Sequence, residues 1–188
     1  MSQSLHQPPH SKSKSLLITT FTTWKSTQPS NASDDLMTAL LGNHGLPPGA
    51  HLLRQLPVHF RLAPHQVIQA VATLHPAAVI CCGMAEKRQH LTVESNGTFQ
   101  GETLYTAVDL ESLVQPLLHT TISHNAGRFV CNYLYYRVLK YLRPQDLATP
   151  CIFVHVPLLT VANRNEIVQD FTQLLQAVYW NSTSKSNR

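Results

Sequence analysis

A cysteine, a histidine and a glutamate occupy positions where the sequence predicts strands and helices to begin or end. The first is Cys131, in the segment Thr121-Ile-Ser-His-Asn-Ala-Gly-Arg-Phe-Val-Cys-Asn132. This segment predicts a short strand, a turn at Ala126-Gly127 and a helix over Phe129–Leu142. Cys131 would lie in the first turn of that helix, where unpaired N–H groups and the helix dipole favour a thiolate, the nucleophilic form of cysteine. The alternative is a small buried apolar side chain that does no chemistry.

His155 and Glu94 are candidates for the groups that would assist this cysteine. His155 interrupts the apolar strand predicted over Cys151–Val156, and Glu94 ends the strand predicted over His90–Glu94. In the parallel sheets of α/β proteins, reactive groups gather at the carboxyl ends of the strands. A cysteine and a histidine give acyl transfer its nucleophile and its proton carrier, and a carboxylate on the second imidazole nitrogen completes the set. The alternatives are a structural, hydrogen-bonded histidine and an exposed acid at a strand end.

The rest of the sequence alternates predicted strands with predicted helices. The strands are expected at Leu16–Phe21, His51–Phe60, Ala77–Cys82, His90–Glu94, Thr120–Ile122 and Cys151–Val156. The helices are expected at Asp34–Leu41, Pro64–Leu74, Val108–His119, Phe129–Leu142 and Glu166–Trp180, with a polar, glycine-containing connection at Ser95–Glu102. Because several strands are apolar throughout, the pattern predicts an α/β fold, a three-layer α/β/α sandwich with a largely parallel central sheet.

Composition divides the 188 residues into one domain and two polar tails. The domain is predicted over residues 16–180, between an N-terminal tail at 1–15, expected to be disordered, and a C-terminal tail at 181–188. The formal net charge is +4, but the tails hold Lys12, Lys14, Lys185 and Arg188 and no acidic residue. The domain itself is therefore formally neutral, and a basic surface for nucleic acid is not expected.

The four cysteines, at positions 81, 82, 131 and 151, do not form the pattern of a disulfide framework. They predict free thiols and a reducing compartment. The N-terminus lacks the apolar segment of a signal peptide, and no run reaches the roughly eighteen apolar residues of a membrane span. The protein is expected to be soluble and cytoplasmic, without a membrane partner. Its 11 histidines lack the spacing of metal ligands, so neither a metal nor a cofactor is predicted.

Three segments resemble the motifs of the pyroglutamyl peptidase I (pyrrolidone-carboxylate peptidase) family, cysteine peptidases that remove an N-terminal pyroglutamate from peptides. Ser123-His-Asn-Ala-Gly-Arg-Phe-Val-Cys-Asn132 is similar to the family's cysteine motif. Gly83-Met-Ala-Glu-Lys-Arg-Gln-His-Leu-Thr-Val-Glu94 is similar to its glutamate motif, and Ile152-Phe-Val-His-Val-Pro157 to its histidine motif. The resemblance extends weakly over residues 16–180 and implies a phosphorylase/hydrolase-like α/β/α sandwich.

This resemblance implies a role for each motif residue. Cys131 would be the nucleophile, His155 the base and Glu94 the orienting acid. Arg88 would lie near the developing oxyanion, alongside the backbone N–H of Cys131. The expected activity is hydrolysis of an N-terminal pyroglutamyl (5-oxoprolyl) peptide bond by a cysteine-type exopeptidase. The alternative is a divergent relative that binds a peptide or a protein without turnover.

The resemblance also implies a substrate pocket lined by Phe21, Trp24 and Met84. The family's loop after the first strand, Gly-Phe-x-Pro-Phe-Gly-Gly, is replaced here by Thr20-Phe-Thr-Thr-Trp-Lys-Ser26, which keeps the two aromatic residues at the same spacing. Met84 stands where many members have a glutamine. The implied partner is a peptide with a blocked N-terminus, and the family also makes a homo-oligomer possible.

Overall fold

The computed structural model describes residues 15–43, 45–143 and 149–184, so most of the predicted N-terminal tail and residues 185–188 lie outside the described residues. Within the described ranges, a six-stranded sheet has the strand order β2-β1-β3-β8-β4-β7. Its strands are β1 (Leu16–Phe21), β2 (Ala50–Leu56), β3 (Ala78–Met84), β4 (Leu91–Glu94), β7 (Thr120–Ser123) and β8 (Cys151–Val156). Strands β1, β3 and β8 are buried along almost their whole length, which explains their continuous apolar sequences.

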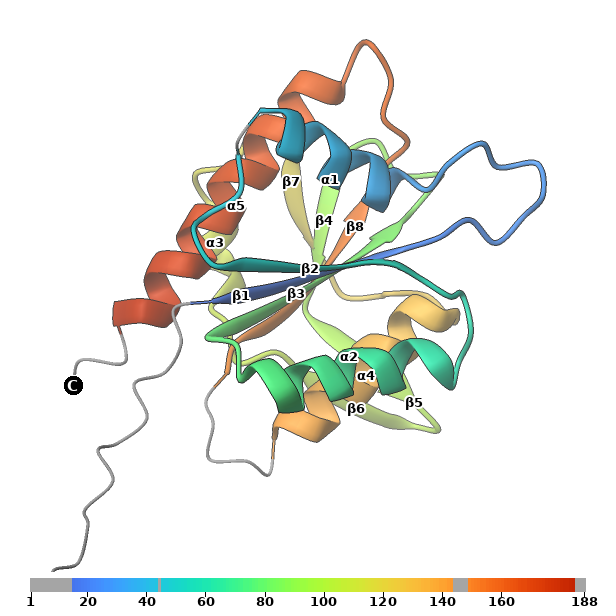
Figure 1. The fold of residues 1–188 in the computed structure, drawn as a ribbon, viewed down its shortest axis with the longest axis vertical. Coiled ribbons are helices and arrows are strands. Elements are labelled where there is room, and N and C mark those ends of the chain that lie inside the picture. The colour runs from blue at the N-terminus through green and yellow to red at the C-terminus, as the bar shows by residue number, and fades with distance from the viewer. Residues whose placement is uncertain (1–14, 44, 144–148, 185–188) are drawn as a thin grey trace, which may run out of the picture.

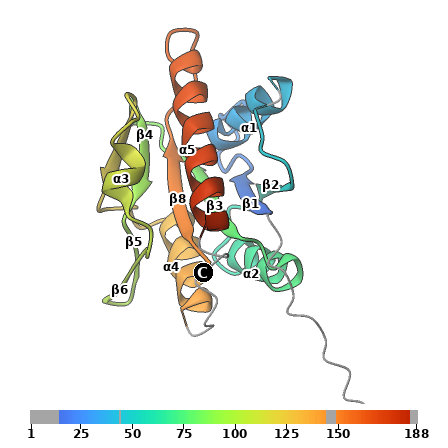
Figure 2. The same ribbon diagram turned by 90° about the vertical axis from the view of Figure 1, so that its left-hand side faces the viewer.

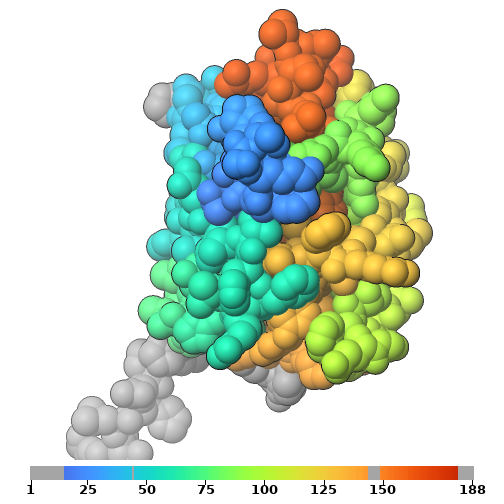
Figure 3. All heavy atoms as spheres, turned by 90° about the vertical axis from the view of Figure 1, so that its right-hand side faces the viewer, coloured from blue at the N-terminus to red at the C-terminus, as the bar shows by residue number. Residues whose placement is uncertain are grey.

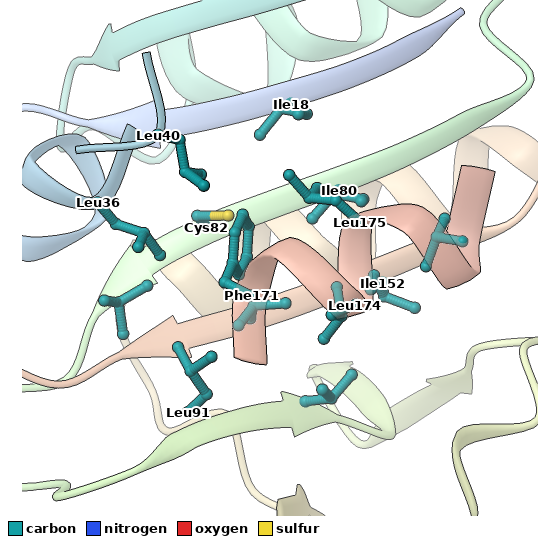
Figure 4. Close-up of a cluster of buried hydrophobic side chains, with 14 of the residues drawn as sticks. Ile18, Leu36, Leu40, Ile80, Cys82, Leu91, Ile152, Phe171, Leu174 and Leu175 are labelled. Atoms are coloured by element: carbon teal, nitrogen blue, oxygen red, sulfur yellow. The ribbon is translucent and has the colours of Figure 1, made fainter. Parts of the chain in front are cut away.

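Helices cover both faces of this sheet (Figure 1, Figure 2). One face packs against α1 (Ala32–Gly42), α3 (Leu110–Val114) and α5 (Arg164–Ser184), and the other against α2 (Leu62–Leu74) and α4 (Val130–Leu142). Figure 4 shows Phe171, Leu174 and Leu175 of α5 packed over the strands of the first face. The predicted α/β/α sandwich is therefore confirmed. None of the helices in the described part of the chain combines the length and hydropathy that a bilayer crossing requires.

Helix α4 presents its apolar stripe to the sheet. Val130, Leu134, Val138 and Leu142, the positions that recur every four residues in the sequence, are all buried. The backbone of Phe129, the N-cap residue, is extended, so the helix begins directly after it. Cys131 consequently lies in the first turn of α4, as the sequence predicts.

Strand β4 runs antiparallel to its neighbour β8, whereas β1, β2, β3 and β8 are parallel to one another. A parallel return would need a crossover of a dozen or so residues, usually with a helix. The link between β3 and β4 comprises only residues 85–90 and contains no helix, so β4 returns in the opposite direction. As a result Thr92 pairs with His155 and Glu94 pairs with Phe153, which places Glu94 beside the interior of β8.

The polar segment after β4 is a hairpin, which the sequence did not predict. Strands β5 (Asn96–Phe99) and β6 (Glu102–Tyr105) form a second, antiparallel sheet. Gln100 and Gly101 form the two-residue turn, and both have positive φ, as the tight turns that match the strand twist require. The short strands carry mostly polar residues because one side of the hairpin is exposed. A search for apolar runs therefore does not detect them.

Helix α3 is shorter than the predicted Val108–His119. It covers Leu110–Val114, and Asp109 is its N-cap residue. The side chain of Asp109 accepts a hydrogen bond from the N–H of Ser112 at 3.2 Å. Pro116 has no N–H with which to bond the carbonyl of Ser112, so the helix cannot continue past this point.

We predict that Gly97→Ala destabilises the protein by roughly 1–3 kcal/mol, the usual cost of overpacking. A Cβ at position 97 would lie 2.5 Å from the backbone nitrogen of Tyr136, because β5 packs directly on α4. Denaturant unfolding of the variant measures the loss. Gly42→Ala is the matched control, since a Cβ there meets nothing within 4 Å. Equal stability of the two variants would contradict close packing of the hairpin on α4.

Candidate active site

Cys131, His155 and Glu94 meet on the face of the sheet that α4 covers. His155 in β8 is paired with Gly83 in β3 on one side and with Thr92 in β4 on the other. Paired residues share a face and side chains alternate along a strand, so Thr92 and Glu94 belong to the same face as His155. The Sγ atom of Cys131 packs on Gly83, where a Cβ would lie 2.7 Å from the sulfur. Gly83 thus leaves the space that the sulfur occupies, one strand away from His155.

The side chains of Glu94 and His155 form a buried pair. Oε1 of Glu94 lies 2.7 Å from Nδ1 of His155, and their side chains are 0% and 7% exposed. The ring of Phe153 lies 4.9 Å from the His155 ring, centroid to centroid, and helps to hold the imidazole in place.

Both members of this pair have lowered pKa values. Burial alone would raise the pKa of Glu94, but the hydrogen bonds from His155 and Arg88 hold it below its usual value. Burial lowers the pKa of His155 below its usual 6.5, and Glu94 opposes this only in part. At neutral pH, Glu94 is therefore ionised and His155 is neutral. Because an ionised carboxylate can only accept, Nδ1 of His155 carries the proton and Nε2 is free to accept one.

The thiol of Cys131 does not have the lowered pKa that its place at a helix N-terminus predicts. Burial of the sulfur raises the pKa to about 12, and the negative charge of Glu94 acts in the same direction. Its own backbone N–H and the Arg88 guanidinium lower the pKa without outweighing burial. The expectation of a thiolate at rest is thus corrected, because desolvation exceeds the effect of the helix end. The resting pair is a thiol and a neutral imidazole.

Arg88 ties the acid to the neighbouring loop. Its Nη1 donates to Oε1 of Glu94 at 2.6 Å and also to the hydroxyl of Thr92. Its Nη2 donates to the carbonyl of Asn125 at 3.1 Å and to Oγ of Ser123 at 3.3 Å. Since Asn125 lies in the turn that leads into α4, one guanidinium connects the end of β4 to the approach of the cysteine helix.

A pocket of about 410 Å³ opens above these residues. Cys131, His155 and Arg88 line it, and so do the three residues that the resemblance assigns to the substrate, Phe21, Trp24 and Met84. Glu94 does not line the pocket and lies behind His155. Figure 3 shows this side of the molecule, where the loop after β1 (blue), the link between β3 and β4 (green) and the turn before α4 (yellow-orange) come together.

The walls of the pocket differ in exposure and in chemistry. Phe21 ends β1 and is almost fully buried, whereas Trp24 in the following loop is 50% exposed. Sδ of Met84 lies 3.4 Å from the N–H of Ala32 at the start of α1, which fixes the thioether beside the pocket. The lining is thus mostly apolar with a few polar groups, as is usual for sites that bind small molecules.

Both the sequence and the fold resemble those of known proteins. A family model described as pyroglutamyl peptidase matches residues 104–172. A pyrrolidone-carboxylate peptidase of Thermoanaerobacter sp. (strain X514) is 28% identical over 145 residues, which cover 63% of this chain and 71% of that protein. One from Brevibacillus brevis is 27% identical over 133 residues, covering 57% of this chain and 62% of that protein.

Solved structures of the same kind share the fold. The pyroglutamyl peptidase I of Bacillus amyloliquefaciens superposes with a TM-score of 0.75 at 18% identity, covering 90% of this chain and 96% of that one. The pyrrolidone carboxyl peptidase of Thermococcus litoralis gives a TM-score of 0.75 at 18% identity, covering 93% and 96%. The sequence therefore resembles pyroglutamyl peptidases in part, and the domain has the fold of solved pyroglutamyl peptidase I structures.

Phe129 is a pocket residue that was not predicted from the sequence. It lines the pocket, is 65% exposed, and its ring centroid lies 5.6 Å from that of Trp24. The signal was present, because Phe129 lies two residues before the cysteine and is part of the cysteine motif. As the N-cap residue it stands outside the apolar stripe of α4, which leaves its side chain for the pocket.

Asn132 is a second residue whose part was not predicted. Its side-chain amide donates to the carbonyl of Thr98 at 2.7 Å and accepts from the N–H of Thr98 at 2.8 Å. The amide therefore bonds β5 as a neighbouring strand would. The residue next to the cysteine thus anchors the hairpin to the start of α4.

We predict that alkylation of Cys131 by iodoacetamide accelerates about tenfold per pH unit from near pH 7 to near pH 10, because only the thiolate reacts. This follows from the thiol pKa of about 12. Mass spectrometry assigns the label, and Cys131→Ser is the control for labelling of the buried Cys81, Cys82 and Cys151. A rate that is already constant near pH 7 would indicate a resting thiolate instead.

Proposed function

We propose that this protein hydrolyses the peptide bond that follows an N-terminal pyroglutamyl residue. The observation that carries the proposal is the buried Glu94–His155 pair at 2.7 Å, whose histidine lines the same pocket as Cys131. The names of the related proteins, pyrrolidone-carboxylate peptidase and pyroglutamyl peptidase, support the choice of substrate.

The protonation states of the site suggest the course of the reaction. Nε2 of His155 takes the proton of the Cys131 thiol as Sγ attacks the carbonyl carbon of the pyroglutamyl residue. The carbon–nitrogen bond then breaks, the imidazolium gives its proton to the leaving amine, and a thioester remains. Water, deprotonated by His155, attacks the thioester, and the sulfur leaves and regains its proton. Glu94 holds the imidazole tautomer throughout and stabilises the imidazolium when it forms.

The tetrahedral intermediate needs donors for its negatively charged oxygen. The backbone N–H of Cys131, at the free end of α4, is the first candidate. Arg88 supplies positive charge in the same pocket, although its terminal nitrogens already bond Glu94, Ser123 and Asn125. We therefore assign Arg88 to holding the acid and the turn before α4, with its charge acting on the oxyanion through space.

The pyrrolidone ring is a small, flat, uncharged lactam that suits an aromatic slot. Phe21, Trp24 and Phe129 supply aromatic surface in the pocket, and Met84 supplies an apolar contact. The paired rings of Trp24 and Phe129 lie at its mouth, because both are largely exposed. Backbone groups of the surrounding loops would bond the lactam amide.

The cellular setting that fits this chemistry is a reducing one. Cys81, Cys82, Cys131 and Cys151 are all free thiols. A nucleophilic thiol keeps its activity where disulfides do not persist, which supports action in the cytoplasm.

The decisive experiment is hydrolysis of a fluorogenic pyroglutamyl amide by the purified chain. We expect turnover by the wild type, none by Cys131→Ser, and a reduced kcat for Glu94→Gln, because the imidazole loses the charge that stabilises its protonated form. Cys82→Ser, a buried thiol on the opposite face of the sheet, is the control for general damage. Peptide binding by the wild type without turnover would favour a non-catalytic binding protein and reject the proposal.

We predict that Trp24→Ala raises KM for the pyroglutamyl amide more than it lowers kcat. A wall contact binds the ground state and the transition state alike, so its loss acts on binding. Trp180→Ala is the matched control, because Trp180 is 65% exposed on α5, which covers the other face of the sheet. A fall in kcat at unchanged KM would remove Trp24 from the slot.

A further inference from the structure

Glu86 joins two loops at the mouth of the pocket. It lies in the link between β3 and β4, two residues before Arg88. Its carboxylate accepts a hydrogen bond from the side-chain amide of Gln28 and forms an ion pair with Nζ of Lys25 at 3.3 Å. Both partners belong to the loop after β1, about sixty residues earlier in the chain.

Gln28 links Glu86 to the backbone at Trp24. Its side-chain oxygen accepts from the N–H of Trp24 at 3.1 Å and from the N–H of Lys25 at 3.2 Å. Its side-chain nitrogen meanwhile donates to Glu86. One carboxamide therefore bonds the peptide that carries the indole and the acid on the opposite loop.

Lys25 acts on the indole ring itself. Its ammonium group lies 4.4 Å from the Trp24 ring centroid while it is paired with Glu86. A cation over an aromatic face attracts the ring. Trp24 is half exposed and its other close aromatic contact is Phe129, which is more exposed still. The position of the indole thus depends on these polar contacts more than on burial.

We propose that Glu86 is a positioning residue, which holds the Trp24 loop over the pocket through Lys25 and Gln28 and so sets the width of the slot for the substrate ring. This inference rests on the proposed function for the identity of that ring. The Gln28 and Lys25 contacts hold the pKa of Glu86 below its usual value, so the carboxylate is charged at neutral pH.

The position of Trp24 can be tested without any turnover. In a Trp180→Phe background Trp24 is the only tryptophan, since the chain has 2. We expect Glu86→Ala to increase quenching of its fluorescence by acrylamide, because the freed indole becomes more accessible. Glu111→Ala, which removes an exposed acid from the short helix α3, should leave quenching unchanged. Equal quenching in the Trp180→Phe parent and in its Glu86→Ala and Glu111→Ala variants would overturn the inference.

The effect on the substrate is measured with a double-mutant cycle. Glu86→Gln and Lys25→Met should each raise KM by about two- to fivefold, the range of an exposed ion pair, with kcat within about twofold. The double variant should be no worse than either single variant, because both break one contact network. If the fold-increase in KM of the double variant equals the product of the two single fold-increases, the two residues act independently and the inference is overturned. Absence of wild-type turnover would reject the proposed function instead, and the quenching result would then decide the role of Glu86.

Discussion

The buried carboxylate of Glu94 is the charge around which the site is built. It receives His155 and Arg88 on one oxygen, and the hydroxyl of Tyr135 in α4 donates to the backbone carbonyl of the same residue at 3.1 Å. Removing one partner of a buried ion pair typically costs about 3–5 kcal/mol, because the remaining charge is left uncompensated. Glu94 therefore links β4 to β8 through its side chain and to α4 through its backbone carbonyl.

Burial decides where the proton of the thiol and imidazole pair rests. Desolvation of the sulfur keeps the proton on Cys131, and the nearby carboxylate of Glu94 acts in the same direction. The imidazole of His155 stays neutral because burial lowers its pKa by more than the Glu94 carboxylate raises it. In the proposed mechanism, the proton therefore moves only when the sulfur attacks and negative charge develops on the substrate oxygen.

Much of this arrangement could be predicted from the sequence. The apolar strands and the stripe of α4 have clear periodicity, and Cys131 and His155 follow from their places on these elements. The antiparallel return of β4 is harder to foresee, since the direction of a strand depends on the length of its link and not on its own residues. The pKa of Cys131 could not be predicted, because a sequence shows the helix end but not how completely the sulfur is desolvated.

The two halves of the sheet differ in how they are held. The parallel strands β1, β2, β3 and β8 contain six or seven residues each, whereas β4 and β7 contain four and form one edge of the sheet. His155 belongs to the longer half and Glu94 to the shorter one. Short strands at an edge open more readily than the centre of a sheet. A brief opening at that edge would separate Glu94 from His155 while most of the core stays closed. Heat or denaturant should therefore abolish the proposed activity before it unfolds the core.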